Sequence, residues 1–400
     1  MSGRAIGKQG GQAAGVGEQR RRARGLSGER GSTLIFLAIV LGAILAIAAL
    51  TIDISLLLLT RVQLQNAADA AALAGAADMA QSGGSQSEAR AAAIRLAAAN
   101  RAFRLADETQ GNVMAAVTVA EDDVTFPESG VIRVVAQRTA LRENPVRSYF
   151  LKVLDPGSNA TMDVRAAAAA SYLDVCGTGC MMPWAPPDRW YDANDNGKYD
   201  PHPSSNPDEY YDPDLTGYKA PGDVGSQVTL KYRKANEAMS SEWYYAVNFP
   251  AVNKGDPVTG ADRYREWIQG CPDPSVLVEL DDTLQIEPGN MVGPSQQGVT
   301  ALIATDPDAR WDNTSGRVVD SDFTRSPRIV PVSFMDPTIG LFKTGGRKKI
   351  QVAKIASFFI ESIAGGNVTG RFLRVSTPGN YVPCTSQSGE SFLYKVRLTD

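Results

Sequence analysis

The chain has 400 residues, of which 43% are hydrophobic and 21% charged, the balance of a folded protein rather than of a disordered one. Its net charge of −4 combines +5 in residues 1–30 with −9 in the remainder. A basic face for nucleic acid is therefore restricted to the first 30 residues, and we expect no nucleic-acid partner. This segment is rich in Gly and Arg without apolar periodicity, so we expect residues 1–30 to be disordered.

A long apolar run follows, and Asp53 is its only charged residue between Ser32 and Leu59. A bilayer core needs about 20 apolar residues, so the run is long enough to span it. It is too long for the roughly 7–15 apolar residues of a signal peptide. A buried core helix would not explain its length or its basic flank. We predict an uncleaved transmembrane helix at 31–59.

The arginines before this run predict the orientation of the chain. Basic residues flanking a single span are retained on the cytoplasmic side. We therefore expect a single-pass protein of the inner (cytoplasmic) membrane, with its N-terminus in the cytoplasm and its bulk outside. Asp53 has two interpretations: it pairs with a partner subunit inside the membrane, or it lies hydrated at the interface.

The pattern remains helical beyond Leu59, and small residues recur every four positions at Ala67, Ala71 and Gly75. Such a stripe lets another helix approach closely, which makes these three residues a candidate helix interface. Alternatively, the stripe packs on the protein's own domain. Gly-Gly-Ser at 83–85 predicts an interruption, followed by a second helix from about 87 to 107.

This part of the chain resembles the N-terminal segment of TadE/TadG-like proteins of the tight-adherence (Flp-type) pilus. The resemblance covers roughly residues 29–80. Its features are Arg30–Gly31 before the apolar run, Asp53 near the end of the run, and the stretch from Arg61 to Ala74, RVQLQNAADAAALA. It implies a pilin-like helix, half in the membrane and half supporting a head, with other pilus-assembly subunits as partners.

The resemblance also bears on processing. Precursors cut by the prepilin peptidase usually carry Glu five residues after the cleavage-site Gly. Here Phe36 lies five residues after Gly31. We therefore expect an uncut chain that stays in the membrane.

The remaining pattern predicts an α+β fold in two parts. Residues 60–175 form a pilin-like head, with a hairpin of strands 113–120 and 131–138, a short helix at 145–154 and a strand at 161–172. Residues 176–400 are rich in Pro, Gly and aromatic residues and form a mostly β extracytoplasmic domain. Its only periodic helical stretches are near 297–304 and 352–363.

All four cysteines lie outside the cytoplasm in this topology, where disulfides persist. They are Cys176, Cys180, Cys271 and Cys384. An even number favours two disulfides, with three possible pairings. A zinc site and free thiols are the alternatives, but the spacing is wide for zinc and the chain has one histidine.

The stretch DANDNGKYD, residues 192–200, resembles the first three quarters of a calcium-binding loop. Its predicted ligands are Asp192, Asn194, Asn196, the backbone carbonyl of Lys198, and Asp200. The twelfth position, where a bidentate Glu belongs, is Pro203. The last ligand would then come from nearby, with Asp208, Glu209, Asp212 and Asp214 as candidates. The alternative is an acidic, solvated turn.

No pattern for catalysis is present. His202, the single histidine, lies between two prolines, and no nucleophile-elbow, zinc-protease or phosphate-loop motif occurs. We predict a membrane-anchored pilus-assembly or minor-pilin-like protein that acts by scaffolding and adhesion, with an extracellular surface ligand as a possible further partner. The alternatives are a membrane-tethered hydrolase with a carboxylate-based site and a calcium-dependent adhesin.

Overall fold

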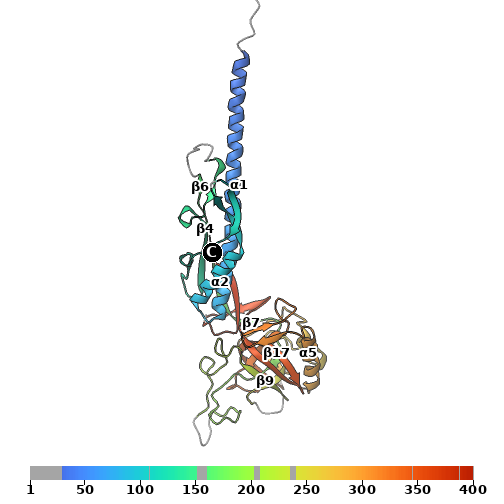
Figure 1. The fold of residues 1–400 in the computed structure, drawn as a ribbon. Coiled ribbons are helices and arrows are strands. Elements are labelled where there is room, and N and C mark those ends of the chain that lie inside the picture. The colour runs from blue at the N-terminus through green and yellow to red at the C-terminus, as the bar shows by residue number, and fades with distance from the viewer. Residues whose placement is uncertain are drawn as a thin grey trace, which may run out of the picture. The chain divides into compact units, whose positions relative to one another are not determined.

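The computed structural model describes residues 29–107, 109–150, 160–201, 208–234, 240–344, 346–386 and 388–399 (Figure 1). The chain divides into two compact units. The first contains the chain up to Leu56 together with Ser148–Ala160, and the second contains Leu57–Arg147 and Thr161–Asp400. The basic segment predicted to be disordered lies outside the described residues.

One helix, α1 (Glu29–Gln81), carries both the apolar run and the alanine-rich stretch, as predicted. It is followed by Gly83 and Gly84, whose φ angles of 68° and 100° favour glycine. Ser85 then caps α2 (Gln86–Ala99), because its hydroxyl accepts a backbone N–H of the first turn at 3.4 Å. The predicted interruption between the two helices is confirmed.

The second helix is shorter than predicted. Residues after Ala99 form strand β1 (Arg101–Asp107), which pairs with β2 (Gly111–Ala116) in an antiparallel hairpin. The expectation of helix up to residue 107 is wrong because pairing with a neighbouring strand outweighs the helical spacing of a few apolar residues.

Short elements follow the hairpin. They are η1 (Glu121–Asp123), β3 (Val124–Thr125), β4 (Val131–Arg138), η2 (Ala140–Arg142), β5 (Val146–Arg147), β6 (Thr161–Met162) and β7 (Val164–Thr178). β4 has its predicted range, but it pairs with β3 and β7. The predicted hairpin between 113–120 and 131–138 is therefore wrong. The backbone becomes helical at Tyr149, and the rest of the helix predicted at 145–154 lies outside the described residues.

β7 is the central strand of a seven-stranded sheet with the order β19-β21-β7-β4-β3. β11 (Val278–Glu279) and β20 (Tyr381–Pro383) also pair with it, while β19 (Val375–Ser376) pairs with β21 (Leu393–Thr399). β21 runs antiparallel to β7. The last strand of the chain thus lies in the same sheet as β4, and the boundary expected at residue 175 falls inside β7.

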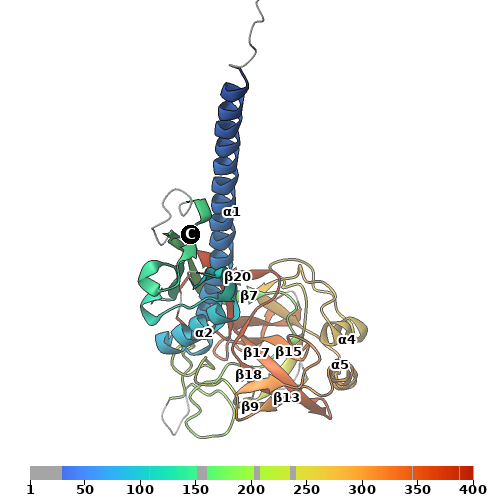
Figure 2. The ribbon, with the colours of Figure 1, turned by 45° about the horizontal axis from the view of Figure 1, so that its top comes forward.

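A second sheet builds the C-terminal region. Its strands are β8 (Trp184–Ala185), β9 (Gln227–Arg233), β10 (Trp243–Asn248), β12 (Thr283–Ile286), β15 (Ile329–Met335), β16 (Phe342–Thr344), β17 (Arg347–Ala364) and β18 (Asn367–Leu373). The order is β12-β10-β9-β18-β17-β15, and β12 also pairs with β17. Strands β12, β10, β9, β18 and β17 therefore form a closed ring of pairings. Figure 2 labels β9, β18, β17 and β15 of this sheet. The helix expected at 352–363 is wrong, because β17 has strand partners along its whole length.

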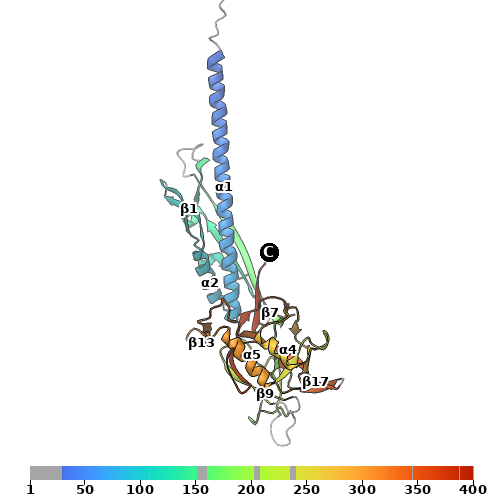
Figure 3. The same cartoon turned by 90° about the vertical axis from the view of Figure 1, so that its right-hand side faces the viewer.

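Two helices pack against each other beside this sheet, α4 (Ala261–Gln269) and α5 (Val292–Ala304) (Figure 3). α5 contains the helix predicted near 297–304, whereas α4 was not predicted. A short hairpin of β13 (Arg310–Asp312) and β14 (Arg317–Val319) follows. Aromatic side chains fill the core between sheet and helices, among them Tyr244, Phe358 and Phe372, all 0% exposed. The mostly β character predicted for this region is confirmed.

Candidate functional site

The apolar part of α1 has no cover within the described chain. Every large apolar side chain from Leu34 to Ile54 is exposed, by 37% or more. An exposed apolar surface of this extent needs lipid or protein against it. The helix is long and apolar enough to cross a membrane.

Asp53, by contrast, is 3% exposed and takes its partners from its own chain. Its carboxylate accepts hydrogen bonds from the Ser148 hydroxyl at 2.6 Å, the N–H of Tyr149 at 2.7 Å and the N–H of Phe150 at 2.5 Å. The backbone becomes helical at Tyr149, so the carboxylate satisfies N–H groups that a helix leaves without partners at its start. Both interpretations of Asp53, pairing with another subunit and hydration at the interface, are therefore wrong for this structure.

The small-residue stripe faces the interior of its own unit. Ala67 and Ala71 are 0% exposed, and Gly75 is also buried. A Cβ added to Gly75 would collide with the Ile132 side chain of β4 and would lie 3.0 Å from the carbonyl oxygen of Ala89 in α2. Gly75 thus packs against α2 and β4, and Ala67 and Ala71 are buried, as the second of the two alternatives expects.

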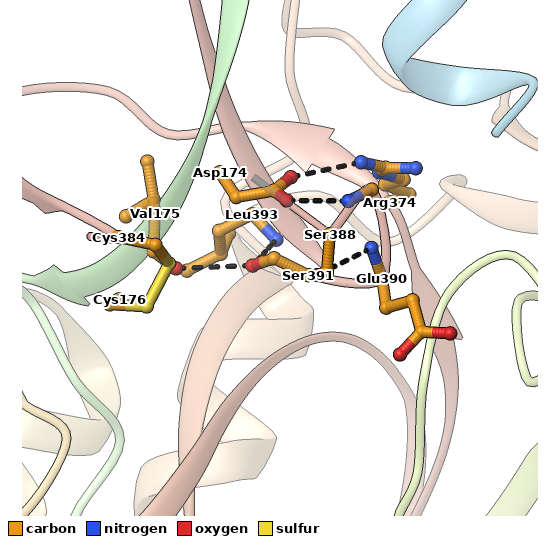
Figure 4. The surroundings of a disulfide bond; sticks show 10 residues. Asp174, Val175, Cys176, Arg374, Cys384, Ser388, Glu390, Ser391 and Leu393 are labelled. Atoms are coloured by element: carbon orange, nitrogen blue, oxygen red, sulfur yellow. Dashed lines mark hydrogen bonds and ion pairs between the residues drawn. A yellow bond between two sulfur atoms is a disulfide. The ribbon is translucent and has the colours of Figure 1, made fainter. Parts of the chain in front are cut away.

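The cysteines form two disulfides, Cys176–Cys384 and Cys180–Cys271. This confirms the predicted disulfides and selects one of the three pairings. The first bond joins β7 to the segment that leads into β21. It therefore joins β7 to the residue that follows β20, another strand of the seven-stranded sheet, and we call this region the neck (Figure 4).

A buried ion pair reinforces the neck. The Asp174 carboxylate accepts a hydrogen bond from Arg374 at 3.1 Å, and both side chains are 1% exposed. Its second oxygen accepts the N–H of Gly389 at 2.7 Å, and its backbone carbonyl accepts the N–H of Cys384 at 2.9 Å. Removing either charge would leave the other buried without a partner, which is strongly destabilising.

The acidic loop forms a tight turn. Asp192 accepts the N–H groups of Asn196 at 3.2 Å and Gly197 at 2.6 Å, and Asn194 accepts that of Asn196 at 3.0 Å. Within the described part of the chain, no group of three His, Cys, Asp or Glu side chains is arranged to hold a metal ion. Calcium binding thus stays a prediction. His202 lies outside the described residues.

Residues 31–78 match the family described as putative Flp pilus-assembly TadE/G-like. The N-terminal segment is TadE/G-like. The match covers α1 almost from end to end and includes Asp53 and the small-residue stripe. No curated protein and no solved structure matches the chain.

Beyond the TadE/G-like segment, a cavity of about 530 Å³ opens beside the Cys180–Cys271 disulfide. Its walls are mostly apolar and include Trp267 and Phe323, and Arg325 and Asn380 add polar groups. This size and lining are typical of small-ligand or side-chain pockets. Nothing in the sequence pattern predicted it, because its walls come from segments far apart along the chain.

A second cavity, of about 980 Å³, is lined by α1, α2 and the region around β13 and β14. It contains two carboxylates, Asp78 and Glu88, the feature that the hydrolase alternative requires outside the acidic loop. Glu88 is exposed and Asp78 is half-buried.

A third cavity, of about 520 Å³, contains an arginine with a structural role. Arg138 is 1% exposed and donates to the carbonyl oxygens of Ala102, Ala115 and Ala116, which fastens β4 to the β1–β2 hairpin. Burial, with a further contribution from Arg104, lowers the pKa of Arg138 to about 10. The side chain stays charged at neutral pH.

Proposed function

We propose that this protein is a membrane-anchored, non-enzymatic component of a Flp-type pilus-assembly system. The observation that carries the proposal is the TadE/G-like match over α1, combined with the exposed apolar surface of that helix. A helix that resembles this family and whose apolar first half has no cover among the described residues fits an anchor in the membrane.

In the proposed orientation, the basic N-terminal segment lies in the cytoplasm and the C-terminal bulk lies outside, with the anchor in the inner membrane. The seven basic residues before residue 31 support this orientation. The two disulfides support it independently, because disulfides persist in oxidising compartments.

The orientation is testable with reporters fused after residue 400. We expect activity from a reporter that folds only outside the cytoplasm and none from one that works only inside. The reverse pattern would overturn the orientation without affecting the family match.

The proposed role is to scaffold other pilus subunits, and the C-terminal region contributes adhesion to a surface ligand. The apolar cavity beside Cys180–Cys271 supports a binding role for this region. The large groove contains the two carboxylates that the hydrolase alternative requires, but the family match is to pilus assembly and does not favour that alternative.

Scaffolding is separable from simple anchoring. The test is co-purification of pilus subunits with the full chain in detergent, beside a variant in which residues 31–59 are replaced by an unrelated apolar span. Both chains should reach the membrane, but only the unaltered one should retain the subunits. Equal recovery would show that the segment anchors the protein and does no more.

A further inference from the structure

The loop at 192–200 does not by itself identify a site. Its side-chain oxygens accept N–H groups of the same turn, and Gly197 supplies the left-handed backbone that the turn needs, with a φ angle of 70°. A turn held in this way is stable without a metal. A site requires an observation that lies outside the loop.

Glu209 provides that observation. It is 2% exposed, and one oxygen of its carboxylate accepts the N–H of Asp200, the ninth loop position, at 2.8 Å. The other oxygen, Oε1, is buried and has no hydrogen-bond partner. Among the described residues, no Lys or Arg forms an ion pair with this carboxylate.

The backbone explains why Glu209 reaches the loop. Tyr191 and Tyr210 form an antiparallel bridge, in which the N–H of Tyr191 donates to the carbonyl oxygen of Tyr210 at 2.9 Å. In an antiparallel pair, the residue after Tyr191 lies opposite the residue before Tyr210. The bridge therefore brings the chain next to Asp192 beside the chain next to Glu209, and the hydrogen bond from Asp200 N–H joins the Glu209 carboxylate to the loop.

A neighbouring carboxylate shows what full compensation looks like. Asp188 is 0% exposed, but it pairs with Lys354 at 3.3 Å and accepts hydrogen bonds from the Tyr211 hydroxyl and two backbone N–H groups. A buried carboxylate is costly unless it is paired and hydrogen-bonded in this manner. Glu209 has one hydrogen bond and no cation, so its charge lacks the compensation that Asp188 has.

We propose that Glu209 supplies the missing last ligand of a calcium ion bound by the loop. The remaining oxygens come from Asp192, Asn194, Asn196, Asp200 and the backbone carbonyl of Lys198. Calcium takes six to eight oxygen ligands in flexible geometry and accepts amide and carbonyl oxygens, whereas magnesium needs a rigid octahedron. Among the described residues, the carboxylates are not arranged as a metal-binding group. Calcium binding would therefore draw Glu209 and the loop oxygens together. The proposal does not depend on the pilus role.

The test uses the full chain in detergent, with calcium as the probe and magnesium as the competitor. Isothermal titration should give a dissociation constant of about 0.1–1 mM for calcium, typical of extracellular modules. Magnesium at the same concentration should give no detectable binding. Glu209→Gln should weaken calcium binding at least tenfold. Asp195→Asn, an exposed carboxylate of the loop that is outside the ligand set, is the matched control and should bind as the unaltered chain does.

A second measurement separates ligation from folding. With chelator present, Glu209→Gln should unfold at the same temperature as the unaltered chain or higher, because it removes an uncompensated buried charge. With 5 mM calcium the order should reverse. No calcium-dependent shift in the unaltered chain up to 10 mM, or full calcium affinity in Glu209→Gln, would overturn the proposal. So would a variant that is equally destabilised with and without calcium, which would assign Glu209 a structural role.

Discussion

Asp53 is a single charged residue in an apolar helix, and its three hydrogen bonds explain how the chain tolerates it. Asp53→Ala would remove the acceptor for the Ser148 hydroxyl and for the first N–H groups of a helical segment. Each buried donor without a partner costs about 1–3 kcal/mol. We expect Asp53→Ala to release Ser148–Phe150 from α1, measured as faster proteolysis and amide exchange around these residues in detergent.

The control for this prediction is Asp53→Asn, which keeps one acceptor oxygen and should have an intermediate effect. Thr51→Ala is a second control, because the Thr51 hydroxyl bonds only to its own helix, at the carbonyl oxygen of Ile47. It should leave the segment protected. If Asp53→Ala behaves like Thr51→Ala, the carboxylate does not hold the segment.

Single residues also mark the limit of what the sequence predicts. The cysteines and the loop at 192–200 could be selected by type and spacing, because both signals are local. The partners of Asp53 lie 95 to 97 positions away, and those of Arg374 lie 200 positions away. Local sequence patterns do not relate residues this far apart. The hydrogen bonds of Asp53 to residues 148–150 and the ion pair of the neck could therefore be identified only from the fold.

At the scale of elements, the α1 stripe makes a prediction about folding. Ala71 is 0% exposed, so Ala71→Leu adds three carbon atoms to a filled interior. Overpacking of this kind costs typically 1–3 kcal/mol. We expect the second unit to unfold at a lower urea concentration, as measured by circular dichroism. Any assembly that requires the folded head should be lost as well.

Ala74→Leu is the matched control, because Ala74 is only half-buried and lines the large groove. It adds the same volume to the same helix and should unfold close to the unaltered chain. An unchanged midpoint in Ala71→Leu, with assembly lost, would return the stripe to its other role as an interface between subunits.

The elements divide into those set by local pattern and those set by partners. α1, the break after it and β4 were predictable because apolar run, glycines and β-branched residues act locally. β17 was not, since a strand buried on both faces loses the alternation of apolar and polar residues and resembles a helix segment. α4 was missed because nine residues hold too few turns for a clear period.

At the scale of the molecule, the C-terminal region is inserted into the head sheet. The residues between β7 and β21 build the second sheet and also contribute β11, β19 and β20 to the first, so the two sheets alternate along the chain. Composition changes at Cys176, and a change of composition predicts a domain that follows the head. The last strand, β21, pairs with β7 through residues more than 200 positions apart. Amino-acid composition cannot predict such a pairing.

The neck disulfide should hold this insertion in place. In the chain-entropy account, closing loops of 208 and 91 residues stabilises the fold by roughly 5 kcal/mol in each case, and the two differ by less than about 1 kcal/mol. The double variants Cys176→Ser with Cys384→Ser, and Cys180→Ser with Cys271→Ser, should therefore lose similar stability.

The two variants should differ in the part of the fold that becomes less protected. Without the neck disulfide, β7 and the chain before β21 are held by non-covalent contacts, among them the Asp174–Arg374 ion pair and the hydrogen bond from the Ser391 hydroxyl to the carbonyl oxygen of Val175. Amide exchange should therefore rise in β21 and in the part of β7 that pairs with it. Without the second disulfide, exchange should rise around the 530 Å³ cavity and leave β21 protected. Hydrogen-exchange mass spectrometry of both variants decides the matter, and equal protection of β21 in the two would show that the sheet retains its last strand without help from the neck.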